Sequence, residues 1–495
     1  MRGIRPRGFA FQDTGHSKWT ACHGRKEPRL PDAAHSHATL PATSSGGYAP
    51  RRRCTLEDHG KLDPARAIAK RLSGAGHRAL IAGGAVRDLL LGRPPHDVDI
   101  ATSARPEEVS ALFPDSREVG AAFGVVLVTH RGECVEVATF RSEGPYLDGR
   151  HPSSVHFTDE REDALRRDFT VNGLFLDPET DEVLDFVGGR EDLEAGMLRA
   201  IGDPATRFRE DHLRMLRAIR FAAQLGFAID PETRAAIRDM APRSERVAPE
   251  RTRDELTRML VGPAPGKALR LLHETGLLRV LLPEVAAMDG VEQPPEFHPE
   301  GDVLTHTLLL FEHMDSPSVE LAFAALFHDI GKPPTMQHGP DRIRFPRHAR
   351  VGSQMTDALC RRLRFSNASR ETIVDLVDQH MKFADVRKMR ESTLKRFLRT
   401  PGFRDHLELH RVDCLSSHRD MDHWEYIRDR LAELPVEDLR PAPLVTGNDL
   451  MDLGYDPGPD LGAELRKLED LQLEGKIRTR EDALERARKD LGGGD

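Results

Sequence analysis

The sequence lacks the long apolar runs and the paired cysteines that mark several protein classes. No stretch approaches the roughly 18 to 20 uncharged apolar residues that cross a bilayer, and the longest apolar run, 321–327, ends at His328-Asp329. The five cysteines are odd in number and never closer than 32 positions. This pattern indicates neither a disulfide framework nor a Cys-x-x-Cys metal site. We therefore expect a protein with no membrane partner in a reducing, cytoplasmic compartment.

An excess of basic residues is also lacking. The chain carries 72 Lys and Arg against 81 Asp and Glu, which gives a net charge of −9. Evenly spread, this charge would disfavour binding to a polyanion. Any surface that binds nucleic acid is therefore expected to be local.

The length of 495 residues suits roughly three domains. Residues 1–55 hold ten basic and three acidic residues without apolar periodicity, so we expect a disordered extension. A flexible tail, an organellar transit peptide and a wrongly chosen start codon are the alternatives for that segment. The patterns beyond it predict an α/β segment over 56–200 and helical segments over 201–290, 291–430 and 431–495.

The α/β segment is expected to begin with a helix that ends near Ser73. Strand signals follow at His77–Ala82, Asp97–Ile100, Gly124–Thr129 and Cys134–Phe140, which are β-branched or alternating segments between Gly, Pro and charge clusters. From residue 207 onward the apolar period is near 3.6. We expect the remainder of the chain to be entirely helical.

Two glycines and three carboxylates form the first group of candidate site residues. Gly83-Gly84 follows a strand, so backbone N–H groups and a helix start can approach an anion there. Asp97 and Asp99 stand two apart in a strand and share a face, which suits hard divalent cations, and Glu136 is a third carboxylate on another strand. A lone Asp-x-Asp is more often a solvated turn or a cap. The preceding glycine pair favours a two-metal site for phosphoryl transfer.

Two further motifs are rich in arginine. Arg166-Arg167 would ordinarily be a solvated pair, but beside a metal and glycine site an arginine can clamp a triphosphate or a ribose. The segment Glu210–Ala223 has the pattern of one amphipathic helix whose polar face carries an Asp and three Arg residues. Simple i,i+3 ion pairing would contribute only about 0.2 to 0.5 kcal/mol per pair.

The hydrogen-bonding groups of the nucleobases suggest that this polar face recognises the base. Cytosine and adenine both present an exocyclic amine beside a bare ring nitrogen, so Asp211 can accept from the amine while Arg214 donates to the nitrogen. Uracil and guanine carry the reverse pattern, and the mismatch costs on the order of a few kcal/mol. One Asp and one Arg therefore suffice to select C and A.

The helical part of the chain contains a set of histidines and aspartates. His306, His328-Asp329 and Asp413 are its members, with His348 and His380 between them. A single His on an apolar helix is more often a core residue than a ligand. The His-Asp pair at the end of an apolar run needs a compensating partner such as a metal. From the residues alone, both interpretations stay open.

Taken together, these motifs resemble the bacterial tRNA nucleotidyltransferase / poly(A) polymerase family, the class II CCA-adding enzymes with an attached HD domain. The resemblance covers roughly residues 60 to 490 and rests on an ordered series: GGAVRD with DVD, VEVATFR, RRDFTVNG, DFVGGREDL, EDHLRMLRAIRF, HPEGDVLTHT, FHDIGK and TGNDLMDLGYDPGPDLG. Departures are few. Gly173 stands where the family usually has Ala, and residues 1–55 have no counterpart.

The resemblance implies an α+β fold: a small mixed-sheet nucleotidyltransferase head (56–200), then an all-helical neck (201–290), an HD body (291–430) and a tail (431–495). It also implies roles for particular residues. Asp97, Asp99 and Glu136 would be catalytic, with Asp97 and Asp99 binding magnesium; Gly84, Arg87 and Arg167 would contact the triphosphate and ribose; Asp211, Arg214, Arg217 and Arg220 would form the nucleotide-selecting helix; and His306, His328, Asp329 and Asp413 would hold a second divalent metal in the HD domain. Residues 142–160 match the family's flexible loop.

The activity so implied is template-independent addition of C, A or both from CTP and ATP to the tRNA 3′ end. Poly(A) synthesis is the alternative within the family, and the 13 acidic against 8 basic residues over 441–495 disfavour it. An HD-type metal-dependent phosphohydrolase, as a main or second activity, is the alternative from another class. A non-catalytic RNA-binding protein is disfavoured by the intact carboxylates.

Overall fold

The computed structural model describes residues 62–118, 124–144, 146, 149 and 153–492. The predicted disorder of residues 1–55 lies outside the described residues. Among the helices of the described part, none has the length and apolar character that crossing a membrane requires.

The head is built on a mixed seven-stranded sheet, as predicted. Its strands run in the order β3-β4-β5-β2-β1-β8-β9, with β2 and β5 parallel and the other neighbours antiparallel. The strands of the sheet are β1 (Ala79–Ala82), β2 (Asp99–Thr102), β3 (Arg117–Glu118), β4 (Val125–His130), β5 (Glu133–Thr139), β8 (Leu174–Leu176) and β9 (Val183–Asp185), and a separate pair consists of β6 (Arg141–Glu143) and β7 (Val155–Phe157). The four predicted strands are confirmed with bounds shifted by one or two residues.

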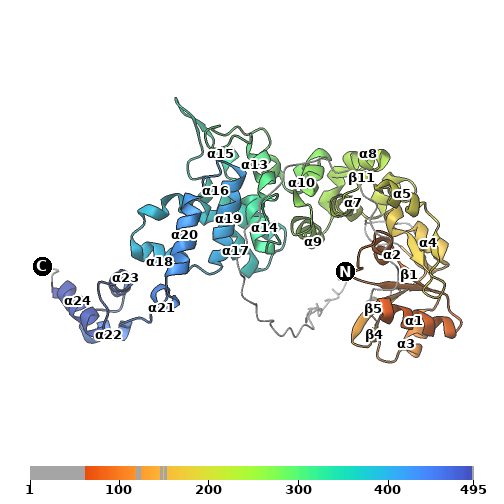
Figure 1. Cartoon of the computed structure of the whole chain (residues 1–495), viewed down its shortest axis with the longest axis horizontal. Coiled ribbons are helices and arrows are strands. Elements are labelled where there is room, and N and C mark those ends of the chain that lie inside the picture. The colour runs from red at the N-terminus through yellow and green to blue at the C-terminus, as the bar shows by residue number, and fades with distance from the viewer. Residues whose placement is uncertain (1–61, 119–123, 145, 147–148, 150–152, 493–495) are drawn as a thin grey trace, which may run out of the picture. The chain divides into compact units, whose positions relative to one another are not determined.

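The two faces of the sheet have different partners. Ile81, Ile100 and Val137 belong to the main buried core, against which α1 and α3 pack on one side of the strands (Figure 1). Leu80 and Ala101, with the opposite strand parity, belong to a smaller cluster on the other face. The helices of the head are α1 (Leu62–Gly74), α2 (Gly84–Leu90), α3 (Pro106–Leu112), α4 (Glu160–Leu165), η2 (Thr170–Asn172) and α5 (Gly189–Ala195).

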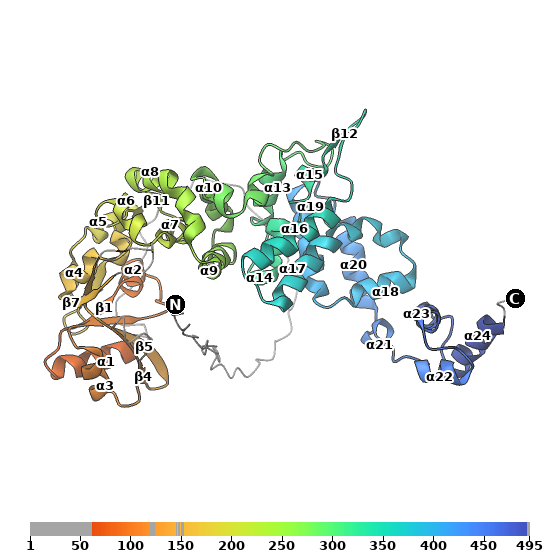
Figure 2. The ribbon, with the colours of Figure 1, turned by 180° about the vertical axis from the view of Figure 1, so that it is seen from behind.

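The rest of the chain is helical with small exceptions (Figure 2). The neck comprises α6 (Pro204–Glu210), α7 (Leu213–Leu225), α8 (Pro231–Met240), η3 (Ala241–Arg246), α9 (Pro249–Leu260), α10 (Pro265–Glu274), α11 (Leu277–Leu281) and α12 (Pro283–Ala286). The body comprises α13 (Val303–Leu310), α14 (Val319–Phe327), α15 (Lys332–Thr335), α16 (His348–Arg362), α17 (Asn367–Gln379), η4 (His380–Lys388), α18 (Glu391–Leu398), α19 (Phe403–Ser416) and α20 (Asp422–Glu433). The tail comprises α21 (Val436–Leu439), α22 (Gly447–Asp452), α23 (Pro459–Leu473) and α24 (Arg480–Gly492).

The prediction of an entirely helical remainder is wrong at two places. β11 (Ala228–Ile229) pairs in parallel with β10 (Met197–Leu198), and β12 (Gln337–His338) forms a hairpin with β13 (Ile343–Arg344). Strands of two residues are too short to produce a period-2 pattern.

The buried core does not stop at the predicted joints near 200 and 290. One cluster of apolar side chains continues from Leu62 in the head to Val412 in the body. Separate clusters begin at Phe383 and at Val445. Head, neck and much of the body therefore share one core, and the domain boundaries stay predictions.

Candidate active site and metal centre

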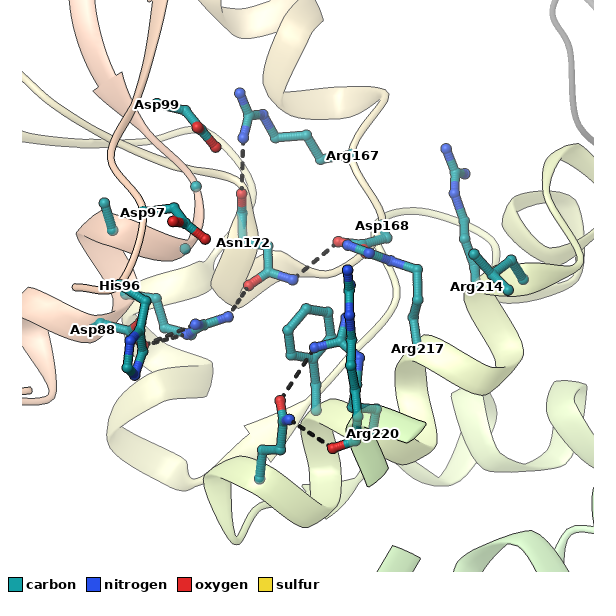
Figure 3. Close-up of a pocket in the computed structure, with 18 of the residues that line it drawn as sticks. Asp88, His96, Asp97, Asp99, Arg167, Asp168, Asn172, Arg214, Arg217 and Arg220 are labelled. Carbon is teal, nitrogen blue, oxygen red and sulfur yellow. Dashed lines mark hydrogen bonds and ion pairs between the residues drawn. The ribbon is translucent and has the colours of Figure 1, made fainter. Parts of the chain in front are cut away.

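A cavity of about 770 Å³ gathers all ten residues predicted for the catalytic and nucleotide-binding sites. Carboxylates of the head and arginines of α7 form its wall (Figure 3), and arginines of α9 line it as well. The predicted residues that line it are Gly84, Arg87, Asp97, Asp99, Glu136, Arg167, Asp211, Arg214, Arg217 and Arg220. Segments more than 100 positions apart in the sequence thus converge on one space.

Asp97, Asp99 and Glu136 converge on the sheet face opposite α1 and α3. Asp99 opens β2, and Asp97 lies just before it rather than within a strand. Both side chains are exposed to the cavity, whereas Val98 and Ile100 are buried on the other side. Because Ile100 pairs with Val137 in the parallel β2–β5 ladder, Glu136 stands beside Asp99.

Burial and the neighbouring carboxylates change the pKa of Asp99. Partial dehydration of the Asp99 carboxylate, followed by the charges of Glu136 and Asp97, raises the pKa of Asp99 to about 6, and the charge of Arg167 opposes this rise. Converging oxygen ligands with mutual repulsion fit hard divalent cations such as magnesium. The residues present thus suit the metal that the sequence pattern predicts.

Gly83 brings the backbone close to Arg167. Its φ is +69°, and a Cβ at this position would lie 2.8 Å from Nη1 of Arg167. Arg167 in turn forms an ion pair with Asp163 at 3.0 Å. The backbone conformation therefore favours glycine here, and a side chain at this position would displace the end of Arg167.

Asn172 forms hydrogen bonds with the arginines that line this part of the cavity. Its side chain accepts a hydrogen bond from Nη1 of Arg87 at 2.7 Å and donates one to Asp168 at 3.1 Å, and its backbone oxygen accepts one from Arg167 at 3.3 Å (Figure 3). No role for Asn172 is predicted from the sequence. Its neighbours in the Arg-Arg-Asp motif were the signal that could have identified it.

The predicted helix Glu210–Ala223 is interrupted, which corrects the expectation for Asp211. α6 ends at Glu210, Asp211 is extended with φ −137° and ψ 109°, and α7 begins at Leu213. The Asp211 carboxylate accepts the Leu213 N–H at 3.0 Å, and this local bond competes with a continuous helix. Asp211 therefore lies on a turn before α7, not on its polar face.

Each arginine of α7 has its own carboxylate partner. Arg214 pairs with Glu210 at 2.6 Å, Arg217 with Asp168 at 2.7 Å, and Arg220 with Glu255 at 2.6 Å. The predicted apolar face of the helix is buried, as Leu213, Met215, Leu216 and Ile219 show. All three carboxylate partners lie outside α7, so the row of arginines is more than pairing along one helix.

The HD body brings together all four predicted metal ligands. Nε2 of His306 lies 3.0 Å from Asp413 and 4.0 Å from Asp329, and Nε2 of His328 lies 3.1 Å from Asp329. His306, His328 and Asp329 are at most 1% exposed. Nitrogen and carboxylate donors in one buried cluster fit a transition metal or magnesium.

The charges around this cluster are strongly coupled. Burial opposes protonation of His306, but the carboxylates of Asp413 and Glu300, 3.0 and 2.7 Å from its ring nitrogens, raise its pKa to about 9. Burial, followed by the charge of His348, lowers the pKa of His380 to about 3. Glu300, His348 and His380 thus belong to the same group of side chains, although the sequence argument assigned them no ligand role.

Family models match three consecutive parts of the chain. A model described as "Poly A polymerase head domain" matches residues 79–199, one described as "Probable RNA and SrmB- binding site of polymerase A" matches 226–288, and one described as "HD domain" matches 302–402. These ranges correspond to the head, the neck and the body.

Curated relatives are named CCA-adding enzymes. The enzyme of Lactobacillus helveticus is 33% identical over 428 residues, which cover 86% of this chain and 96% of the relative. The enzyme of Geobacillus stearothermophilus is 47% identical over 223 residues, which cover 45% of this chain and 55% of the relative. That second alignment thus spans about half the length of the relative it matches.

Solved structures show the same likeness. The Bacillus stearothermophilus CCA-adding enzyme in complex with CTP matches with a TM-score of 0.65 and 29% identity, covering 88% of this chain and 99% of the other. The Thermotoga maritima enzyme complexed with tRNA matches with a TM-score of 0.57, covering 89% of this chain and 97% of the other, and at 19% identity it shows the shared fold alone.

Proposed function

Since the chain belongs to the family of CCA-adding enzymes, we propose that it adds C, A or both from CTP and ATP to the 3′ end of tRNA without a template. One observation carries the proposal: the three carboxylates and the Asp211/Arg214 pair line a single cavity. A nucleotide can then meet the carboxylates with its phosphates and the pair with its base. A tRNA-processing role also agrees with the predicted cytoplasmic location.

We propose that the carboxylates of the cavity bind the metal ions that act on the reacting phosphate. Asp97, Asp99 and Glu136 would hold magnesium, and the chemistry that bound magnesium supplies at such a site is activation of the ribose hydroxyl and neutralisation of the leaving pyrophosphate. Arg167, held by Asp163, and Arg87, held by Asn172, present cationic groups beside them. These guanidinium groups would fix the triphosphate before reaction.

The neck side of the cavity is proposed to select the base. Asp211 can accept from the exocyclic amine shared by C and A, because a carboxylate offers about four lone-pair sites and its bonds to Leu213 and Arg251 leave some unused. Arg214 carries five N–H groups, of which Glu210 and two backbone oxygens take three. Arg217 and Arg220 would position the segment through Asp168 and Glu255.

The assay for this proposal uses purified protein and labelled tRNA ending before CCA, in C, or in CC, with each NTP supplied separately. Incorporation of C and A, each on the correct substrate, and loss of incorporation in the double variant Asp97→Ala/Asp99→Ala are expected. Unlimited A addition on any RNA end would instead support poly(A) synthesis. Undiminished turnover in the double variant would refute the carboxylate assignment.

A second activity is favoured by the buried cluster of the HD body. The four side chains His306, His328, Asp329 and Asp413 lie within 4.0 Å of a neighbour, an arrangement that would hold a metal and direct a water at a phosphoester. His328→Ala should abolish metal-dependent phosphate release from a model phosphoester, while nucleotide addition at the head stays unchanged. If the wild-type protein hydrolyses nothing with magnesium, manganese, nickel or cobalt, the HD body is a scaffold.

A further inference from the structure

The aromatic ring of Phe221 lies close to three guanidinium groups. The Cζ atoms of Arg220, Arg217 and Arg87 are 4.1, 5.1 and 5.3 Å from the centroid of this ring. A cation within about 6 Å of an aromatic centroid is attracted to the electron-rich face of the ring. Guanidinium groups are also planar and stack on such faces. All three contacts are therefore within the range of cation–π attraction.

The three arginines belong to two different walls of the active-site cavity. Arg217 and Arg220 lie on α7 together with Phe221, whereas Arg87 lies on α2 of the head. Phe221 itself lines the cavity, although it is only 8% exposed and belongs to the main buried core. One ring thus contacts an arginine predicted to bind the triphosphate and two arginines of the helix predicted to select the base.

Each of these guanidinium groups also forms an ion pair with one carboxylate. The pairs, at 2.6 to 2.8 Å, are Arg87–Asp88, Arg217–Asp168 and Arg220–Glu255. Three like charges around one ring repel one another, and the negative faces of the ring and the carboxylates offset this repulsion. A guanidinium group held by both a ring and a carboxylate is ordered before a nucleotide binds. The entropy cost of ordering a long arginine side chain on binding is thereby reduced.

The ring of Phe221 is in turn oriented by the head. Phe169 packs against it at a centroid distance of 5.9 Å, and the two ring planes are inclined by 77°. This is the edge-to-face arrangement that aromatic pairs prefer. Phe169 is fully buried and directly follows Asp168, the partner of Arg217. The position of the ring therefore depends on the head segment as well as on α7.

A buried phenylalanine ordinarily contributes only to the hydrophobic core. Phe227, two residues after the end of α7, is of this ordinary kind. It is also 8% exposed and belongs to the same core, but it is absent from the lining of the cavity. Among the described residues, no cation lies over its ring. Phe221 and Phe227 are thus equally buried and differ in their contacts with arginine.

We propose that Phe221 is a positioning residue for nucleotide addition, whose ring holds Arg87 in a fixed position relative to the arginines of α7. The inference rests on the proposed function, in which Arg87 fixes the triphosphate and α7 belongs to the base-selecting side of the cavity. A weaker attraction between the ring and the guanidinium groups should therefore impair triphosphate binding and base selection together. A phenylalanine that served only the core would be insensitive to the electron density of its ring.

The test replaces Phe221 in the full chain by phenylalanines that carry one, two or three ring fluorines, introduced by stop-codon suppression. Fluorine withdraws electron density from the ring face, so the attraction to cations weakens stepwise while the shape of the ring changes little. The measurements are kcat and KM for CTP and for UTP on labelled tRNA that ends before CCA. The KM for CTP should rise with each fluorine, to about 3- to 10-fold with three. The value of kcat should fall less, and the preference for CTP over UTP should shrink in parallel.

The same fluorinated residues in place of Phe227 are the matched control and should change none of these values. Phe221→Leu, which removes the ring, should exceed the effect of three fluorines. A constant KM and constant selectivity across the series at Phe221 would overturn the positioning role, even if Phe221→Leu is inactive or unfolded. Equal responses at the two positions would overturn it as well. A wild-type protein that incorporates no nucleotide would instead refute the proposed function, and this inference with it.

Discussion

The two carboxylate oxygens of Asp211 accept hydrogen bonds from the two Nη atoms of Arg251, at 3.2 and 2.8 Å. Arg251 lies 40 residues later on α9 and lines the same cavity. Parallel bonds between a guanidinium and a carboxylate fix the plane of the carboxylate. The group that we propose to read the base amine is therefore oriented by a different helix of the neck.

This pairing makes Arg251 a positioning residue with a measurable effect. Arg251→Ala should lower kcat/KM for CTP and ATP by about 10- to 100-fold, equivalent to about 1.4 to 2.7 kcal/mol of transition-state stabilisation. Arg251→Lys should restore little, because an ammonium group lacks the planar fork. Arg253→Ala on the same helix is the control, since Arg253 pairs with Asp254 instead. Wild-type selectivity and rate in Arg251→Ala would exclude this role.

Replacement of Asp211 itself should change selectivity as well as rate. Asp211→Ala removes the acceptor for the exocyclic amine, so use of CTP and ATP should fall and discrimination against UTP and GTP should shrink by about 10-fold or more. The measurement is single-turnover incorporation of each NTP on tRNA that ends in C. Unchanged ratios among the four NTPs would count against base reading by Asp211.

Glu136 and Glu133 provide a matched pair on one strand. Both are exposed on β5, but Glu136 lines the cavity beside Asp99 and Glu133 is absent from its lining. Glu136→Gln should lower nucleotide incorporation by about 10²- to 10³-fold, since removal of one preorganised charge from such a site has effects of this size. Glu133→Gln should have no effect, and tRNA affinity should persist in both. Similar activities of the two variants would remove Glu136 from the catalytic group.

Gly83 and Gly202 allow backbone strain to be separated from a steric clash. Both have a φ of +69°, but a Cβ at Gly83 would meet Arg167 at 2.8 Å, while a Cβ at Gly202 meets nothing within 4 Å. Each Ala variant should lose about 1 to 3 kcal/mol of stability, because L residues rarely adopt a positive φ. Gly83→Ala should also lower activity at least 10-fold by displacing Arg167. Equal activity in the two variants would show that the close approach is unimportant.

The sequence predicts the head sheet well because strand alternation is a local property. Asp99 and Glu136 alternate with buried Val98, Ile100 and Val137, and this alternation places each carboxylate on the side of its strand away from its buried neighbours. The mixed sheet followed by helices is accordingly confirmed. The pairing of β2 with β5 depends on the whole fold and could not be derived from either segment.

The segment predicted to select the nucleotide shows where local sequence patterns fail to predict the structure. Every residue of Glu210–Ala223 is acceptable in a helix. The composition therefore does not predict the interruption of the helix at Asp211. The bonds that favour the break come from the Leu213 N–H and from Arg251. In the HD body, likewise, His328-Asp329 is visible as a pair in the sequence. The approach of His348 and His380 depends instead on the packing of α16 against α17 and of α17 against α14.

The ion pair of Arg217 with Asp168 connects α7, the helix proposed to select the base, to the segment that carries Arg167. Arg214 adds a hydrogen bond to the backbone oxygen of Arg166 at 3.1 Å. Under the proposed function, these connections would set the distance between the group that holds the triphosphate and the group that binds the base. A chimaera that joins the head of one family member to the neck of another should therefore have the wrong distance between these groups. Transplanting residues 166–168 together with 214–217 should avoid this defect. In enzyme engineering, residues 166–168 and 214–217 should therefore be exchanged together. An exchange of the whole chain on one side of residue 200 would separate them.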